Sequence, residues 1–63
     1  MLNKAKEGDT FITKSGSSAV YKSLECEGVH ILSVEGLDYY YTDDGKVFDL
    51  FPSFYQNNSL DLI

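Results

Sequence analysis

The sequence contains no arginine, and this absence bears on the first class of function to consider. Its five basic residues are all lysines, against ten acidic residues, which gives a net charge of −5. Arginine is the residue that most often reads guanine and phosphate through paired hydrogen bonds. We therefore expect no nucleic acid among the partners of this chain, whose acidity favours a basic partner surface instead.

Cysteine and histidine are almost absent as well. Cys26 is the only cysteine and His30 the only histidine, so neither an internal disulfide nor a zinc site with about four such ligands can form. A chain of 63 residues is expected to form one domain, residues 1–63, which on folding buries only about 60% of its surface. Without a metal or a cofactor, its stability must come from an aromatic-rich core or from self-association.

Long apolar segments are also missing. No stretch approaches the roughly 20 apolar residues of a membrane span. The first seven residues lack the apolar run of a signal peptide, and a free cysteine without an export signal is typical of a reducing compartment. We therefore expect a soluble cytoplasmic protein with no membrane partner.

What the chain does contain is a series of short β-type segments rich in Tyr, Phe, Val, Ile and Thr. Pro52 ends the series because proline cannot donate to a strand ladder, and 53–58 is expected to be a loop or a single helical turn. We predict five strands and a candidate sixth, at about 8–13, 19–26, 29–34, 38–42, 46–50 and 59–62.

Glycine-containing turns separate these segments and predict which residues share a face. Glu27-Gly28, Glu35-Gly36 and Asp44-Gly45 each fit a two-residue hairpin loop, because glycine readily takes a positive φ. Residues directly opposed across a hairpin point to the same side of the sheet. The buried face is then expected to collect Tyr21, Leu32, Val34, Leu37, Tyr39, Tyr41, Phe48 and Leu50, joined by Phe11 or Ile12.

The opposite face of the predicted sheet is not cleanly polar. It collects Val20, Leu24, Cys26, Val29, Ile31 and Tyr40. Monomeric proteins rarely leave large contiguous apolar areas exposed. This face is therefore an interface, or a region covered by the C-terminal strand, or the result of strands that change sides in a strongly bent barrel.

Four turn and strand motifs follow one another along the chain. They are Gly8-Asp9, Thr13-Lys14-Ser15-Gly16, the Tyr-Tyr-Thr-Asp-Asp-Gly-Lys hairpin at 40–46, and the ending Ser-Leu-Asp-Leu-Ile at 59–63. Their order resembles that of a group of small proteins encoded by tailed bacteriophages and prophages, from which the stretch 51–55 departs. The resemblance implies a small SH3-like barrel, a phage origin and an accessory role directed at a protein in the bacterial host cytoplasm. It implies no functional residue.

No arrangement of reactive residues in the sequence favours catalysis. Glu25 is expected opposite His30 and could orient its ring toward Ser23, but no glycine elbow or oxyanion loop accompanies them. The paired carboxylates fall in exposed tight turns, and no set of acidic residues has the alternating spacing of a calcium loop. The sequence therefore predicts a protein that is not an enzyme and that holds no metal.

Aromatic residues outside the predicted core mark where a partner would bind. Tyr40 is the outward member of a run of three tyrosines, and tyrosine is enriched at binding hot spots. The aromatic stretch 51–55 is either a lid over the end of the sheet or a loop that docks on a partner. We predict a partner-binding surface composed of Val20, Leu24, Ile31, Tyr40, Phe51, Phe54 and Tyr55.

Taken together, these patterns predict an all-β fold. It would be a five- or six-stranded antiparallel SH3-like barrel or strongly twisted sheet, with at most one short helical turn near 53–58. The predicted function is non-catalytic binding of a host protein. Two alternatives stay open: a homo-oligomer with a self-complementary apolar face, which could enclose a small ligand between subunits, and an acidic decoy of a DNA-binding protein.

Overall fold

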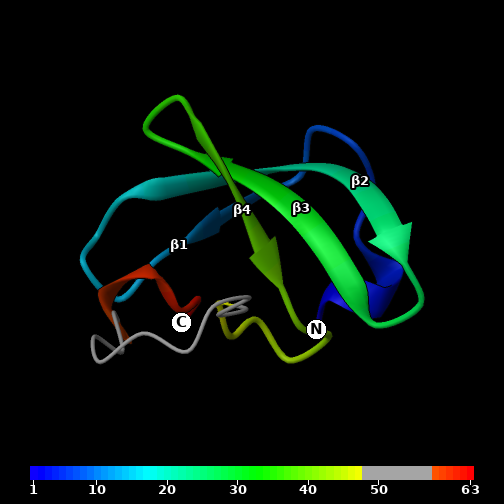
Figure 1. Ribbon diagram of the computed structural model, residues 1–63. Coiled ribbons are helices and arrows are strands. Elements are labelled where there is room, and N and C mark those ends of the chain that lie inside the picture. Colours follow the sequence, from blue (N-terminus) through cyan, green and yellow to red (C-terminus); the bar gives the residue numbers. More distant parts are fainter. Residues whose placement is uncertain (48–57) are drawn as a thin grey trace.

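A four-stranded antiparallel sheet forms the body of the protein. The computed structural model describes residues 1–47 and 58–63. The strands follow one another in space as they do in the chain, and no α-helix occurs in the described residues (Figure 1). They are β1 (Thr10–Ile12), β2 (Ser18–Cys26), β3 (Val29–Val34) and β4 (Leu37–Tyr41). The predicted all-β class is therefore confirmed at the level of an antiparallel sheet.

Two short 3₁₀ turns flank the sheet. The first, η1 (Leu2–Lys4), was not predicted; it buries Leu2 against the sheet. The second, η2 (Asn58–Leu60), begins where the helical turn was expected but extends over the first half of the candidate sixth strand, 59–62. A single bridge between Thr13 and Leu62 is the only strand-like pairing of that segment in the described part of the chain.

The hairpin between β3 and β4 has the predicted geometry. Glu35 and Gly36 have φ values of 52° and 81°, and a two-residue loop of this kind needs both to be positive. The predicted pairs follow from it: Val34 lies opposite Leu37, and Leu32 lies opposite Tyr39.

The hairpin between β2 and β3 departs from the predicted register. Two bulges in β2 each insert one extra residue, so Tyr21 lies opposite Leu32 instead of Val34. Because two single shifts restore the alternation, Tyr21 keeps its predicted inward orientation. Between the bulges only one shift applies, and Leu24 takes the place opposite His30 that was predicted for Glu25.

The turn after β4 is one residue longer than predicted. Tyr41 pairs with Val47 and the Thr42 N–H donates to the Lys46 carbonyl at 2.9 Å, which leaves a three-residue loop at 43–45. Its third residue, Gly45, has a φ of 83°, as expected of the left-handed residue that closes such a loop. The predicted strand 46–50 lies mostly outside the described residues, as do its core members Phe48 and Leu50.

Most of the predicted core residues that the structure describes are buried or partly buried. Leu37 is the clear exception: it is 62% exposed because it directly follows the hairpin loop at the end of the sheet. Of the two candidates on β1, Phe11 packs against the core and Ile12 is exposed. Among the described residues, the buried apolar ones are Leu2, Ala19, Tyr21, Leu32, Val34, Tyr41 and Leu62, with Tyr39 partly buried beside them.

The C-terminal residues connect the two edges of the sheet. The Ile63 N–H donates to the Ile12 carbonyl on β1, and the Leu62 N–H donates to the Gly45 carbonyl in the turn after β4. The Tyr41 hydroxyl donates to the Leu60 carbonyl at 2.7 Å, and burial, followed by the nearby negative charge of Asp61, raises the pKa of Tyr41 to about 12. The hydroxyl therefore stays protonated, and Figure 1 shows the C-terminus lying beside β1.

Candidate binding surfaces

The faces of the sheet divide the predicted binding residues into two groups. Ile31 on β3 lies directly opposite Tyr40 on β4, so both point to the same side. Val20 on β2 pairs with Ser33, two positions from Ile31, and therefore shares that side. Val20 is 37% exposed and the other two are half-buried. We call the surface formed by Val20, Ile31 and Tyr40 the outer face.

Two further apolar residues extend the outer face. Val29 precedes Ile31 by two residues on β3 and is half-buried. Ile12 pairs with Ser18 on β2, in the same alternation as Val20, and is 48% exposed. The sequence left Phe11 and Ile12 as alternatives for the core, and the pairing of Ile12 with Ser18 places it on the outer face.

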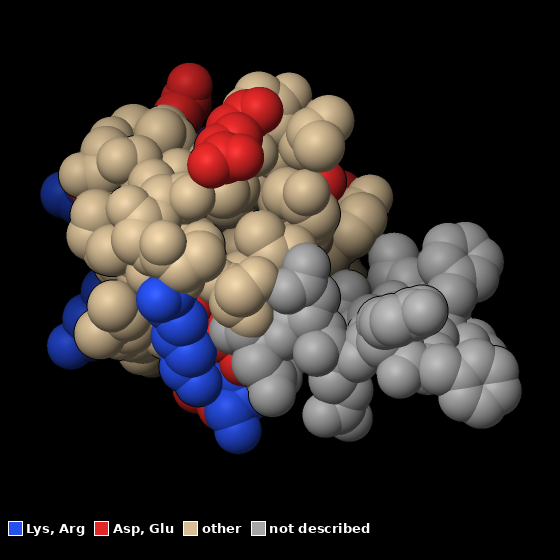
Figure 2. Space-filling model, turned by 90° about the vertical axis from the view of Figure 1, so that its left-hand side faces the viewer, with Lys and Arg blue, Asp and Glu red and all other residues tan. Residues whose placement is uncertain are grey.

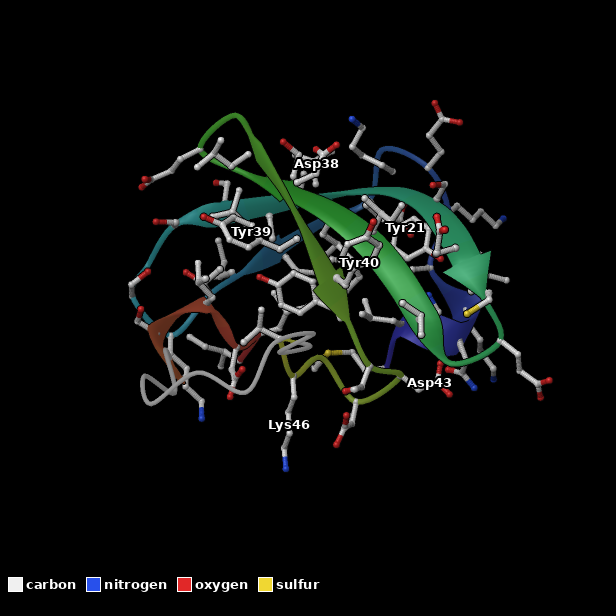
Figure 3. All side chains as sticks on the ribbon, viewed as in Figure 1. Tyr21, Asp38, Tyr39, Tyr40, Asp43 and Lys46 are labelled. Carbon is white, nitrogen blue, oxygen red and sulfur yellow. The ribbon has the colours of Figure 1, made fainter. Side chains whose placement is uncertain are left out.

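The charges beside the outer face neutralise one another. Lys22 Nζ lies 3.1 Å from Asp38 Oδ2 across the sheet, with both side chains about half exposed. Such a pair contributes little stability, but it leaves no net charge at this point. Figure 3 shows Tyr39 and Tyr40 leaving β4 in different directions. Figure 2, which views one end of the sheet, shows a broad uncharged area between acidic side chains at the top and a group of lysine and acidic side chains below.

Leu24 belongs to the other side of the sheet. The single register shift between the two bulges turns it toward His30, and it is 58% exposed there. It forms part of the wall of an open basin of about 610 Å³, which we define by six of its lining residues. These are Leu2, Tyr21, Leu24, Glu27, His30 and Asp43.

A chain of hydrogen bonds runs through the basin. The Tyr21 hydroxyl lies 2.7 Å from Nδ1 of His30, and Nε2 of His30 lies 2.6 Å from Oδ1 of Asp43. Burial, followed by the charge of Asp43, raises the pKa of Tyr21, so the phenol remains a donor. In the tautomer whose Nδ1 accepts this hydrogen bond, the ring donates from Nε2 to the Asp43 carboxylate.

This arrangement satisfies the hydrogen-bonding capacity of a histidine that is only 2% exposed. Both ring nitrogens are engaged, one by a phenol and one by a carboxylate. The predicted Glu25–His30 pair is wrong, because the bulges place Leu24 opposite the ring and the partners come from β2 and from the turn after β4. Nothing in the sequence indicated Asp43 as a partner of His30, because thirteen residues separate the two.

The remaining predicted site residues, Phe51, Phe54 and Tyr55, lie outside the described residues. Cys26 is exposed and free. In residues 1–47 and 58–63 no three metal-ligating side chains gather into a potential metal site. Nor do these residues contain a helix that is long and apolar enough to span a membrane.

These features describe a small antiparallel β protein with an exposed apolar face on one side of its sheet and an open basin on the other. Comparison of the chain with protein-family models, with curated proteins and with solved structures gives no match in any of the three.

Proposed function

We propose that the protein is a non-catalytic binding module that docks a protein partner on its outer face. The observation that carries the proposal is the cross-strand pairing of Ile31 with Tyr40, beside the exposed Val20. These side chains stand on paired strands, so little conformational entropy is lost when a partner covers them. Tyrosine is one of the residues enriched at binding hot spots.

The charge distribution supports a protein partner over a nucleic acid. The chain has no arginine, and Lys22, the lysine that borders the outer face, is already paired with Asp38. A phosphate backbone would meet a net charge of −5 and an apolar surface.

The phage-type motif order supports placing the partner in a bacterial host. In this proposal the protein is a phage accessory protein of the host cytoplasm that binds or inhibits a host protein. The hydrogen bonds from the C-terminal residues to β1 and to the turn after β4 support completion of the sheet toward an SH3-like barrel. Such closure would leave the outer face as the outside of the barrel.

The proposal is tested with an Ile31→Glu variant. The tagged full chain is used to capture proteins from a bacterial lysate, and each captured protein is identified, purified and measured for affinity. We expect Ile31→Glu to weaken binding by about 30-fold or more, because it places a charge at the centre of the contact.

The matched control is Leu37→Glu, which introduces the same charge at an exposed leucine on the neighbouring strand, outside the outer face. Tyr40→Ala serves as a second outer-face variant. Unchanged affinity in both outer-face variants, with folding verified by circular dichroism, would exclude the outer face as the docking surface.

Self-association is the alternative that the same exposed face favours. A second copy could cover Ile31 and Tyr40 as well as another protein could. Light scattering of the wild type decides between the two: a monomer agrees with the binding module, whereas a dimer that Ile31→Glu reduces to monomer supports the homo-oligomer.

A further inference from the structure

The basin on the inner side of the sheet carries an excess of negative charge. Glu7, Glu27 and Asp43 line it, and Lys22 is the one lysine among its lining residues. The Lys22 ammonium is held by Asp38 at 3.1 Å, so it does not neutralise the three carboxylates. Within the described part of the chain, neither the Glu7 nor the Glu27 carboxylate forms a hydrogen bond or an ion pair.

The same basin offers apolar surface beside this charge. Leu2 is 1% exposed and belongs to the core, so it contributes to the floor. Leu24 stands 58% exposed at the wall, where its methyl groups remain open to solvent. An anion would be repelled here, and a purely apolar ligand would leave the carboxylates without a counter-charge.

The Tyr21–His30–Asp43 chain fixes one carboxylate of the basin in place. Asp43 accepts a hydrogen bond at Oδ1 from His30, whose ring is itself held by Tyr21. The Asp43 side chain is nevertheless 59% exposed, which leaves it accessible from solvent. A charged group held before the ligand arrives costs less to order during binding.

We propose that this basin receives a lysine or arginine side chain from a protein partner. The alkyl stem of that side chain would pack on Leu24, and its cationic head would lie between Glu27 and Asp43. Long basic side chains combine these two properties, since their stems bury against apolar surface while their heads form charge-assisted hydrogen bonds. The inference rests on the proposed function only in taking the partner to be a protein, and it uses residues outside the outer face.

A small probe tests the site without the partner. The ¹⁵N-labelled full chain is titrated with n-butylguanidinium chloride while amide chemical shifts are recorded, with sodium chloride added to hold the ionic strength constant. We expect saturable shifts at the amides of Leu24, Glu27, Gly28 and Asp43. The neutral alcohol 1-pentanol, which has a similar alkyl chain but no charge, should give no saturable shifts at these amides.

Two charge-matched variants make the test specific. Glu27→Gln removes a carboxylate of the basin, whereas Glu25→Gln makes the same change two residues away, outside the residues that line it. We expect Glu27→Gln to weaken binding of n-butylguanidinium by about fivefold. Glu25→Gln should leave the affinity within about twofold of the wild-type value.

Equal losses in the two variants would attribute the attraction to overall charge and would overturn the site. The site would also be overturned by shifts that fall elsewhere, or by 1-pentanol binding as well as the cation. Because no partner protein is present, these outcomes are independent of the Ile31→Glu experiment. Failure of the probe to bind the basin would say nothing about the outer face. Failure of the outer-face variants to weaken partner binding would likewise say nothing about the basin.

Discussion

His30 joins three parts of the chain that are far apart in sequence. Its ring contacts Tyr21 on β2, stands on β3, and reaches Asp43 in the turn after β4. A buried imidazole is expensive unless both nitrogens have partners, and here the two partners leave no ring nitrogen unsatisfied. The arrangement therefore has a structural role in holding the turn against the sheet.

Removing one hydroxyl group tests this role. Tyr21→Phe keeps the ring in the core but leaves Nδ1 of His30 buried without a donor, so we expect a loss of about 1–3 kcal/mol in the free energy of unfolding. Tyr40→Phe removes the same atom from a half-buried tyrosine of the outer face and should change stability by less than about 0.5 kcal/mol.

Urea denaturation of the wild type and both variants measures the difference. An equal effect of the two substitutions would show that the bond from Tyr21 to His30 contributes nothing specific to the fold. The partners of His30 could not be predicted from sequence, because one depends on two bulges and the other on the length of a distant turn.

At the scale of single elements, the glycine turns differ in how closely other residues surround them. Gly36 and Gly45 have nearly the same φ, 81° and 83°. A Cβ atom at Gly36 would meet nothing within 4 Å, whereas one at Gly45 would lie 2.6 Å from Met1 Sδ and 3.1 Å from Leu62 Cβ. Gly45 thus supports both a left-handed backbone and the close approach of the C-terminal segment.

Alanine substitutions separate these two effects. Gly36→Ala should cost about 1–2 kcal/mol, the usual penalty for a side chain in the left-handed region. Gly45→Ala should cost more, by about 1–3 kcal/mol, because Leu62 must also shift. Thermal unfolding compares the two, and a Gly45→Ala protein as stable as Gly36→Ala would contradict the tight packing of the C-terminal residues on this turn.

The elements also show why register was only partly predictable. The Glu35-Gly36 loop has the minimal two-residue form, so its sequence determines its pairing. The bulges in β2 have no comparable signal: neither Lys22 nor Glu25, which occupy the two irregular positions, is a residue that demands one. At the turn after β4, a glycine in third position fits a three-residue loop, and its sequence was also compatible with the shorter form.

At the scale of the whole molecule, the bulges place binding residues on opposite sides of the sheet. Val20, Ile31 and Tyr40 form the outer face, as their alternation predicted, and Leu24 lines the basin. The core residues Leu2 and Leu62 were missed for a different reason. Each lies in a short terminal segment that is too brief to show a period, and each is buried only after the chain has folded around it.

The central claim is that a protein partner covers the outer face. Methyl cross-saturation tests it most directly: the chain carries labelled methyl groups, and the captured partner is irradiated within the complex. We predict strong intensity loss at Val20 and Ile31, with little loss at Leu37, which is exposed but lies outside the outer face. Loss at Leu37 without loss at Val20 and Ile31 would contradict the claim and place the contact elsewhere.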